Sequence, residues 1–149
     1  MISNNIAELQ ISYSHKTEKE FRIKIKKSAD AYKSFINCWS EDLIELQEEF
    51  KVLLLNNSNE VLGVHSLSKG SSKGTVVDLK LLFAIALKSC SNAIIIAHNH
   101  PSGTLKPSRS DLELTKKIKE CGELLDVKLL DHLIITKDEF YSMVDNNSI

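Results

Sequence analysis

The chain has 149 residues, of which 42% are hydrophobic and 26% charged, the composition of a single globular domain that buries a sizeable core. Its 19 basic and 20 acidic residues leave a net charge of −1, which argues against binding to nucleic acid through bulk electrostatics, although a local basic patch could still contact phosphates. No apolar run approaches the length of a membrane span, and the first residues lack the basic and apolar regions of a signal peptide, so we expect a cytoplasmic protein.

Three cysteines, Cys38, Cys90 and Cys121, support that expectation. Their number is odd, they lie far apart in the sequence, and none belongs to a Cys-x-x-Cys motif. We therefore predict reduced cysteines that serve mainly in packing, as is usual in the cytoplasm.

Residues 1–46 are predicted to form a β-hairpin followed by one helix. Strands are expected over 6–14 and 19–26, because apolar and basic residues alternate in the second segment with the period of a half-buried strand. The basic side chains there favour an edge strand protected by lysines over a phosphate-binding surface. Ser28 is expected to cap a short helix whose apolar and aromatic residues recur at helical spacing up to Trp39.

Two antiparallel strands are predicted next, over 51–55 and 60–67, joined by a polar turn at 56–59. The segment 68–75 contains two glycines and is expected to be a loop beside the site described below. It lacks the Gly-Lys-Ser/Thr ending of a phosphate-binding loop. The following helix, over 76–90, is apolar on nearly every side, which predicts burial against a sheet.

The run Ala93 to Ala97 has no polar residue, as expected of a central strand, and two histidines follow it. Imidazole is the commonest metal ligand in proteins, and alternate residues of an extended chain point to the same side, so His98 and His100 can face one point. Asp111 adds a carboxylate from the first turn of the next predicted helix. Two imidazoles and one carboxylate are a usual set of ligands for catalytic zinc, with one position left for water.

The same residues also have a purely structural interpretation. A lone His-x-His is more often part of a polar loop than of a metal site. Ser108 followed by Asp111 resembles a capping box, although Glu or Gln is the usual partner of the cap, and Pro101 and Gly103 are common turn residues. The two interpretations are compatible, because a carboxylate in the first turn of a helix can cap that helix and still bind a metal.

The helix that begins after Ser108 is expected to run to about Cys121, with Gly122 as its C-terminal stop. Further strands are predicted over 127–130 and 133–136, where apolar residues return.

The pair Asp131-His132 lies between those two predicted strands. It could hydrogen-bond to a metal ligand from behind, or it could form an interior corner of the fold. Residues 140–143 are expected to close the sheet and 144–149 to be a loose tail. Because strands and helices mix without strict alternation, we predict an α/β fold with a mixed sheet and helices on both faces.

The order of the two histidines, seven further residues, then Ser-x-x-Asp resembles the JAMM motif of JAB/MPN metalloproteases. The fuller wording His-Asn-His-Pro-Ser-Gly, with Asp131-His132 followed by three aliphatic residues further on, is similar to the bacterial RadC-like branch of that family. The likeness covers about residues 47–143 of what we take as a single domain over 1–149. It implies the cytidine-deaminase-like α/β sandwich of JAB/MPN domains.

The resemblance also implies a function: a zinc-dependent hydrolase of amide type that acts on a peptide or protein, with Zn²⁺ held by the two histidines and Asp111. It places the general base at Glu48, two residues before a phenylalanine at the start of a strand, and it makes Ser108 the donor to the oxyanion. Glu49 is the competing base. Strand alternation allows only one of the two glutamates to face the site.

Other functions fit the sequence less well. A zinc deaminase needs His-x-Glu and Pro-Cys-x-x-Cys ligands, which are absent, and an HNH nuclease spreads its residues over a ββα-metal unit. A DNA-repair role, long attached to RadC-like proteins by name, is weakened because about 46 residues without an evident helix-hairpin-helix segment precede the JAB region. A non-catalytic MPN scaffold usually lacks a metal ligand, and none is missing here. The sequence points to no particular substrate or oligomeric state.

Overall fold

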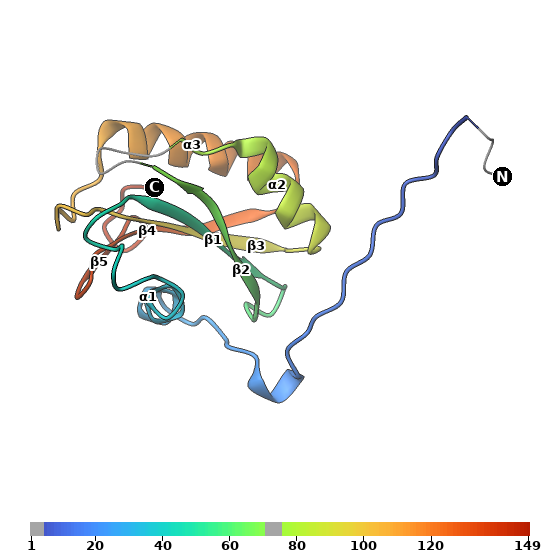
Figure 1. Ribbon diagram of the computed structural model, residues 1–149, viewed down its shortest axis with the longest axis horizontal. Coiled ribbons are helices and arrows are strands. Elements are labelled where there is room, and N and C mark those ends of the chain that lie inside the picture. The colour runs from blue at the N-terminus through green and yellow to red at the C-terminus, as the bar shows by residue number, and fades with distance from the viewer. Residues whose placement is uncertain (1–4, 71–75) are drawn as a thin grey trace.

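The computed structural model describes residues 5–70 and 76–149 and shows a mixed five-stranded sheet between helices (Figure 1). Helix α1 lies on one face of the sheet, and α2 and α3 lie on the other. The predicted α/β class, with helices on both faces, is confirmed. In chain order the elements are η1 (Lys19–Phe21), α1 (Ser28–Ile36), β1 (Glu49–Leu55), β2 (Val61–Lys69), α2 (Leu79–Lys88), β3 (Ala93–Asn99), α3 (Arg109–Leu124), β4 (Lys128–Ile135) and β5 (Phe140–Ser142).

The strand order in the sheet is β2-β1-β3-β4-β5, with β3 in the centre. Strand β1 runs antiparallel to both β2 and β3, β4 is parallel to β3, and β5 is antiparallel to β4. Every residue of β3 is buried, because an apolar strand in this position is covered on both faces. The register sets His98 beside Phe50 and Ile134, so β3 ends between the start of β1 and the end of β4.

Side chains of the central strands alternate between two cores. Leu53 and Ile95 belong to the core under α1, whereas Phe50 and Ile96 belong to the core under α2 and α3. This is the two-residue period of an extended strand. His98 follows Ile96 by two residues and therefore faces the α2/α3 layer.

The predicted N-terminal β-hairpin is wrong. Residues 6–14, which Figure 1 shows in blue, extend away from the sheet and form no strand among the described residues. Within 19–26 the structure has the 3-10 turn η1 and one isolated β-bridge, between Lys24 and Glu60. Alternation indicates an extended backbone, but a strand also needs a surface that covers its apolar side. Phe21 has no such cover, since it is 69% exposed.

Helix α1 begins at Ser28, but the residue at its cap position is Lys27, not the predicted serine. The Asp30 carboxylate accepts the main-chain N–H of Lys27 at 3.1 Å and that of Lys26 at 2.9 Å. Hydrogen-bond donors at the start of the helix are therefore satisfied by an acidic residue at its third position, as such helices require.

Helix α3 continues through Gly122, which was predicted to stop it, and ends at Leu124. A Cβ atom on residue 122 would lie 2.2 Å from the carbonyl oxygen of Val127. The glycine is needed for this close approach of the helix to the chain that leads into β4. The strands predicted over 127–130 and 133–136 form one strand, β4, whose pairing with β3 shifts by one residue at Leu130.

Gly122→Ala is expected to lower the free energy of unfolding by about 1–3 kcal/mol, because the added methyl group forces the helix away from the Val127 carbonyl. Chemical denaturation of both chains measures the difference. Gly63→Ala is the matched control, since a Cβ there meets nothing within 4 Å. Equal stability of the two alanine variants would contradict the close-approach explanation.

The C-terminal segment is also more ordered than the predicted loose tail over 144–149. The main-chain N–H of Ser148 donates to the Met143 carbonyl at 2.7 Å, and Ile149 packs against the core under α2 and α3. Of the loop predicted over 68–75, residues 71–75 lie outside the described part of the chain. No helix among the described residues combines the length and the apolarity needed to cross a membrane.

Candidate metal centre

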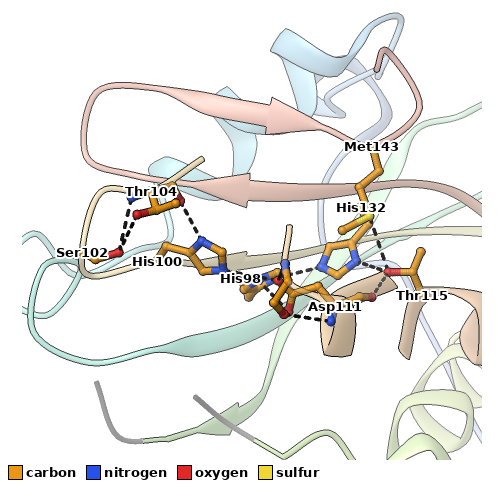
Figure 2. A network of polar contacts seen from close by, with 9 residues as sticks. His98, His100, Ser102, Thr104, Asp111, Thr115, His132 and Met143 are labelled. Carbon is orange, nitrogen blue, oxygen red and sulfur yellow. Dashed lines mark hydrogen bonds and ion pairs between the residues drawn. The ribbon is translucent and has the colours of Figure 1, made fainter. Parts of the chain in front are cut away.

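Two histidines stand at the C-terminal end of β3. His98 is 1% exposed, and His100 follows it, with its main-chain N–H bonded to the Ile135 carbonyl at 3.1 Å. Their Nε2 atoms lie 3.0 Å apart, and Figure 2 shows the two rings side by side. Phe50 stacks on the His98 ring, with centroids 5.9 Å apart and planes 4° from parallel. The extended backbone therefore brings both imidazoles to one point, as the spacing predicts.

Asp111 reaches the same point from the first turn of α3. Its Oδ1 lies 3.3 Å from His98 Nε2 and its Oδ2 lies 3.4 Å from His100 Nε2. The carboxylate also accepts the Ser108 main-chain N–H at 2.8 Å, while the Ser108 hydroxyl oxygen accepts the Asp111 N–H at 3.1 Å. One residue thus takes part in a capping box and in the cluster, so the two interpretations of the motif are compatible in this structure. Among the described residues, these three are the group that could hold a metal ion.

The loop after β3 determines where the hydrogen of the His100 ring lies. Its Nδ1 is 2.7 Å from the Thr104 carbonyl oxygen, which can only accept, so Nδ1 carries the hydrogen. The turn is closed by the Gly103 N–H on the His100 carbonyl at 2.9 Å, with Gly103 at φ +83°, where a glycine is favoured. In the neutral ring, Nε2 has no hydrogen and directs its lone pair toward Asp111.

The charges of the cluster favour a cation at its centre. Burial would raise the pKa of Asp111, but its contacts with His100 and His98 hold that pKa well below the ordinary value. Burial alone would lower the pKa of His100, yet its bonds to Asp111 and to the Thr104 carbonyl raise it overall. The metal-free cluster therefore keeps an ionised carboxylate and tends to hold a proton, which is the behaviour of a site that attracts positive charge.

Of the pair Asp131-His132, only the histidine reaches the cluster. His132 Nε2 lies 2.7 Å from His98 Nδ1, and His132 Nδ1 lies 2.6 Å from the Thr115 hydroxyl (Figure 2). The Asp131 carboxylate instead accepts the Ser142 hydroxyl at 2.6 Å. The aspartate therefore ties β4 to β5, and the histidine contacts a candidate ligand from behind.

Thr115, which is fully buried on α3, is not among the site residues predicted from the sequence. It lies one turn after Asp111 and shares the buried side of the helix with Ile118 and Gly122. A signal was present, because a polar residue four positions after a candidate ligand, within an otherwise apolar stripe, occupies the same helical face.

The two glutamates at the start of β1, Glu48 just before it and Glu49 as its first residue, point to opposite sides because of the alternation of the strand. Glu49 is buried and binds the Lys51 ammonium at 2.7 Å and the Ser66 hydroxyl at 2.8 Å. Glu48 is half-buried on the side of the cluster: burial raises its pKa, the charges of the two histidines lower it, and the charge of Asp111 raises it again. Glu48 is therefore the glutamate whose carboxylate interacts electrostatically with the cluster, whereas Glu49 is held in an ion pair with Lys51.

Comparisons with known proteins show the family to which the chain belongs. The RadC-like JAB domain model matches residues 25–148. The chain is 46% identical over 142 residues to a UPF0758 protein of Flavobacterium johnsoniae, a match that covers 94% of this chain and 60% of the relative. UPF0758 proteins of Staphylococcus haemolyticus and Staphylococcus carnosus are 46% identical over 99 residues and 39% over 124 residues, which covers 43% and 54% of those relatives.

A mixed sheet that carries a His-x-His at the end of its central strand and an aspartate on the next helix is the arrangement expected of a JAB domain. The chain belongs to the RadC-like JAB family, so the resemblance seen in the motif is confirmed. The chain spans 60% of the length of the Flavobacterium relative and about half the length of the two staphylococcal ones.

Proposed function

We propose that this chain binds one zinc ion at His98, His100 and Asp111 and uses it to hydrolyse an amide bond in a peptide or protein. The proposal rests on one observation: electron-rich atoms of His98, His100 and Asp111 lie close to one another. Two ring nitrogens lie 3.0 Å apart, and each lies 3.3–3.4 Å from a different oxygen of the Asp111 carboxylate. Such groups repel one another unless a proton or a metal cation lies among them.

The donor set fits zinc. Zinc takes nitrogen and oxygen ligands at about 2.0–2.2 Å in a tetrahedron, whose edges are then about 3.3–3.6 Å long. With one donor atom taken from each of the three residues, these atoms lie within 4.8 Å of one another, and the 3.0 Å between the two ring nitrogens is close to one such edge. Magnesium and calcium prefer sites made of oxygen alone, so two imidazoles favour zinc over either.

In the proposed reaction, a bound zinc ion would supply the activation of water and the polarisation of the substrate carbonyl that zinc hydrolases use. Glu48 acts as the general base, because it is the half-buried carboxylate whose pKa is affected by the charges of the cluster. Burial raises its pKa, and a base with a raised pKa holds the proton of the attacking water long enough to pass it to the leaving nitrogen.

Ser108 is proposed as the donor to the developing oxyanion. Its hydroxyl oxygen accepts the Asp111 main-chain N–H, which leaves the hydroxyl hydrogen to donate. The support is its position at the start of α3, beside one of the three proposed ligands, together with the family resemblance. Loss of one such donor typically lowers the rate by about 10²–10³-fold.

The test starts from chain purified without metal and then loaded with zinc. Mass spectrometry should find about one zinc per chain, and the loaded chain should cleave members of a library of peptides and isopeptides. A chelator should stop cleavage and added zinc should restore it. Failure to take up zinc would contradict the proposal and favour a non-catalytic scaffold, and zinc uptake without cleavage would reject the hydrolase.

Zinc affinity is expected to fall as the pH falls. Zinc must displace the proton that His100 binds, and the pKa of His100 is raised overall even though burial lowers it. Below that pKa, one competing proton costs about tenfold in affinity per pH unit, whereas Asp111 stays ionised.

Competition titrations with a zinc indicator at pH 8 and pH 5.5 measure this change. His65→Gln, on the edge strand β2, is the matched control and should follow the wild-type curve. An affinity equal at both pH values would contradict the role of His100 as a ligand.

A further inference from the structure

The hydroxyl of Thr115 has one hydrogen and three neighbours. Its Oγ1 lies 2.6 Å from the main-chain oxygen of Asp111, 2.6 Å from His132 Nδ1 and 3.5 Å from the Met143 sulfur (Figure 2). A carbonyl oxygen cannot donate, and two oxygens 2.6 Å apart repel without a hydrogen between them. Sulfur is a weak acceptor at a longer distance. The Thr115 hydroxyl therefore donates to the Asp111 carbonyl.

This direction decides which hydrogen His132 carries. Because the only hydrogen of the Thr115 hydroxyl is used, its oxygen must accept, and His132 Nδ1 must be the donor. The His132 side chain is fully buried, and its ring contacts are Thr115, His98 and the edge of Phe50. Neither ring nitrogen is bonded to a carboxylate, so a second hydrogen would place a buried charge there without a direct counter-charge, which is costly. His132 is therefore neutral, and its Nε2 is an acceptor.

The position of the hydrogen on the His98 ring follows in the same way. Its Nδ1 is 2.7 Å from His132 Nε2, and because that atom accepts, His98 Nδ1 carries the hydrogen. His98 Nε2 then has no hydrogen in the neutral ring and faces Asp111 and His100. Each proposed histidine ligand thus has its other nitrogen occupied, His100 by a main-chain carbonyl and His98 by His132.

We infer that Thr115 and His132 are positioning residues, which fix the His98 ring so that its Nε2 lone pair is available to the metal. The inference rests on the proposed function for its consequence, metal affinity, but the hydrogen positions can be tested without metal. The hydrogen bonds run from the main-chain oxygen of Asp111 through Thr115 and His132 to His98. They therefore link the proposed aspartate ligand on α3 to the proposed histidine ligand on β3. A shift of α3 would change both ligands together.

The first test uses the metal-free wild type at pH 8. Nitrogen-15 NMR of the histidine rings should find the hydrogen of His98 on Nδ1 and that of His132 on Nδ1. A His98 ring whose Nδ1 carries no hydrogen would overturn the inference. This measurement needs no variant and no zinc, so it gives an answer even if the proposed zinc site fails.

The second test compares Thr115→Val with Thr115→Ser. Valine keeps the shape and removes the hydroxyl, so zinc affinity should fall by about 10–100-fold, the usual cost of losing a partner behind a ligand, and the His98 ring should show a mixture of the two hydrogen positions. Serine keeps the hydroxyl and should restore both. Equal losses in the two variants, or no loss in valine, would overturn the inference.

A second pair of variants, at His132, keeps the inference testable if a Thr115 variant does not fold. His132→Gln can place an amide oxygen near His98 Nδ1 and should retain most of the zinc affinity, whereas His132→Leu has no acceptor and should lose it by a similar factor. A leucine variant that folds and binds zinc as the wild type does would overturn the inference. Wild-type chain that takes up no zinc would reject the proposed function alone.

Discussion

Asp111→Ala is expected to fold and to carry no zinc, whereas the wild type carries about one ion per chain. The change removes the anionic ligand and leaves two imidazoles, whose Nε2 atoms lie 3.0 Å apart, without a counter-charge for the cation. Its effect on affinity should exceed the 10–100-fold that is typical when only a partner behind a ligand is lost. Metal content by mass spectrometry, after dialysis against a weak chelator, measures it.

Asp111 also caps α3, so loss of metal must be separated from damage to the helix. Asp30 caps α1 in the same way, since its carboxylate accepts the Lys27 main-chain N–H at 3.1 Å, and it lies far from the cluster in sequence. Asp30→Ala should lose its cap and keep one zinc. His98→Ala removes a ligand without touching a cap and should match Asp111→Ala. Full zinc in Asp111→Ala would show that this carboxylate is a helix cap only.

The part of the site that the sequence predicted is the part with local signals. An apolar run that stops at His98 and His100 indicates a buried strand with two side chains on one face. Ser108 and Asp111 mark the start of a helix by a capping pattern that can be recognised within four residues. Together these local signals are sufficient to predict the three proposed ligands without knowledge of how the elements pack.

The parts that could not be predicted depend on packing between distant segments. Contact of His132 with His98 follows from the parallel pairing of β3 with β4, and Thr115 joins them because α3 packs on that sheet. Residues 19–26 show the reverse: their alternating pattern predicts a strand, but no other part of the described chain covers Phe21, which stays exposed. A periodic pattern predicts backbone shape well and burial less well.

The glutamates at the start of β1 show how one extra contact resolves a local ambiguity. Alternation predicts that only one of Glu48 and Glu49 faces the site, without choosing between them. The choice follows from Lys51, which shares a face with Glu49 and binds it at 2.7 Å. The Lys51 ammonium also lies 5.1 Å from the centre of the Trp39 ring, so Glu49 is committed to the core under α1.

Glu48→Gln is therefore expected to keep one zinc per chain and to lose about 10²–10⁴-fold in the rate of hydrolysis, the usual contribution of a general base. Glutamine has the same size but cannot accept a proton at neutral pH. Zinc content and kcat on a substrate drawn from the peptide library measure the two effects on the same sample. A glutamine variant that retains wild-type kcat would remove Glu48 from the mechanism.

Glu49→Gln is the matched control and separates catalysis from stability. Its side chain is buried in the ion pair with Lys51, and removal of one partner of such a pair costs up to about 3–5 kcal/mol, yet zinc content and rate per folded molecule should stay the same. The wild-type rate at saturating zinc should also decline on the acid side as Glu48 is protonated. Because burial raises the pKa of Glu48, this decline begins at a higher pH than for a free glutamate, and the residual rate of Glu48→Gln should lack it.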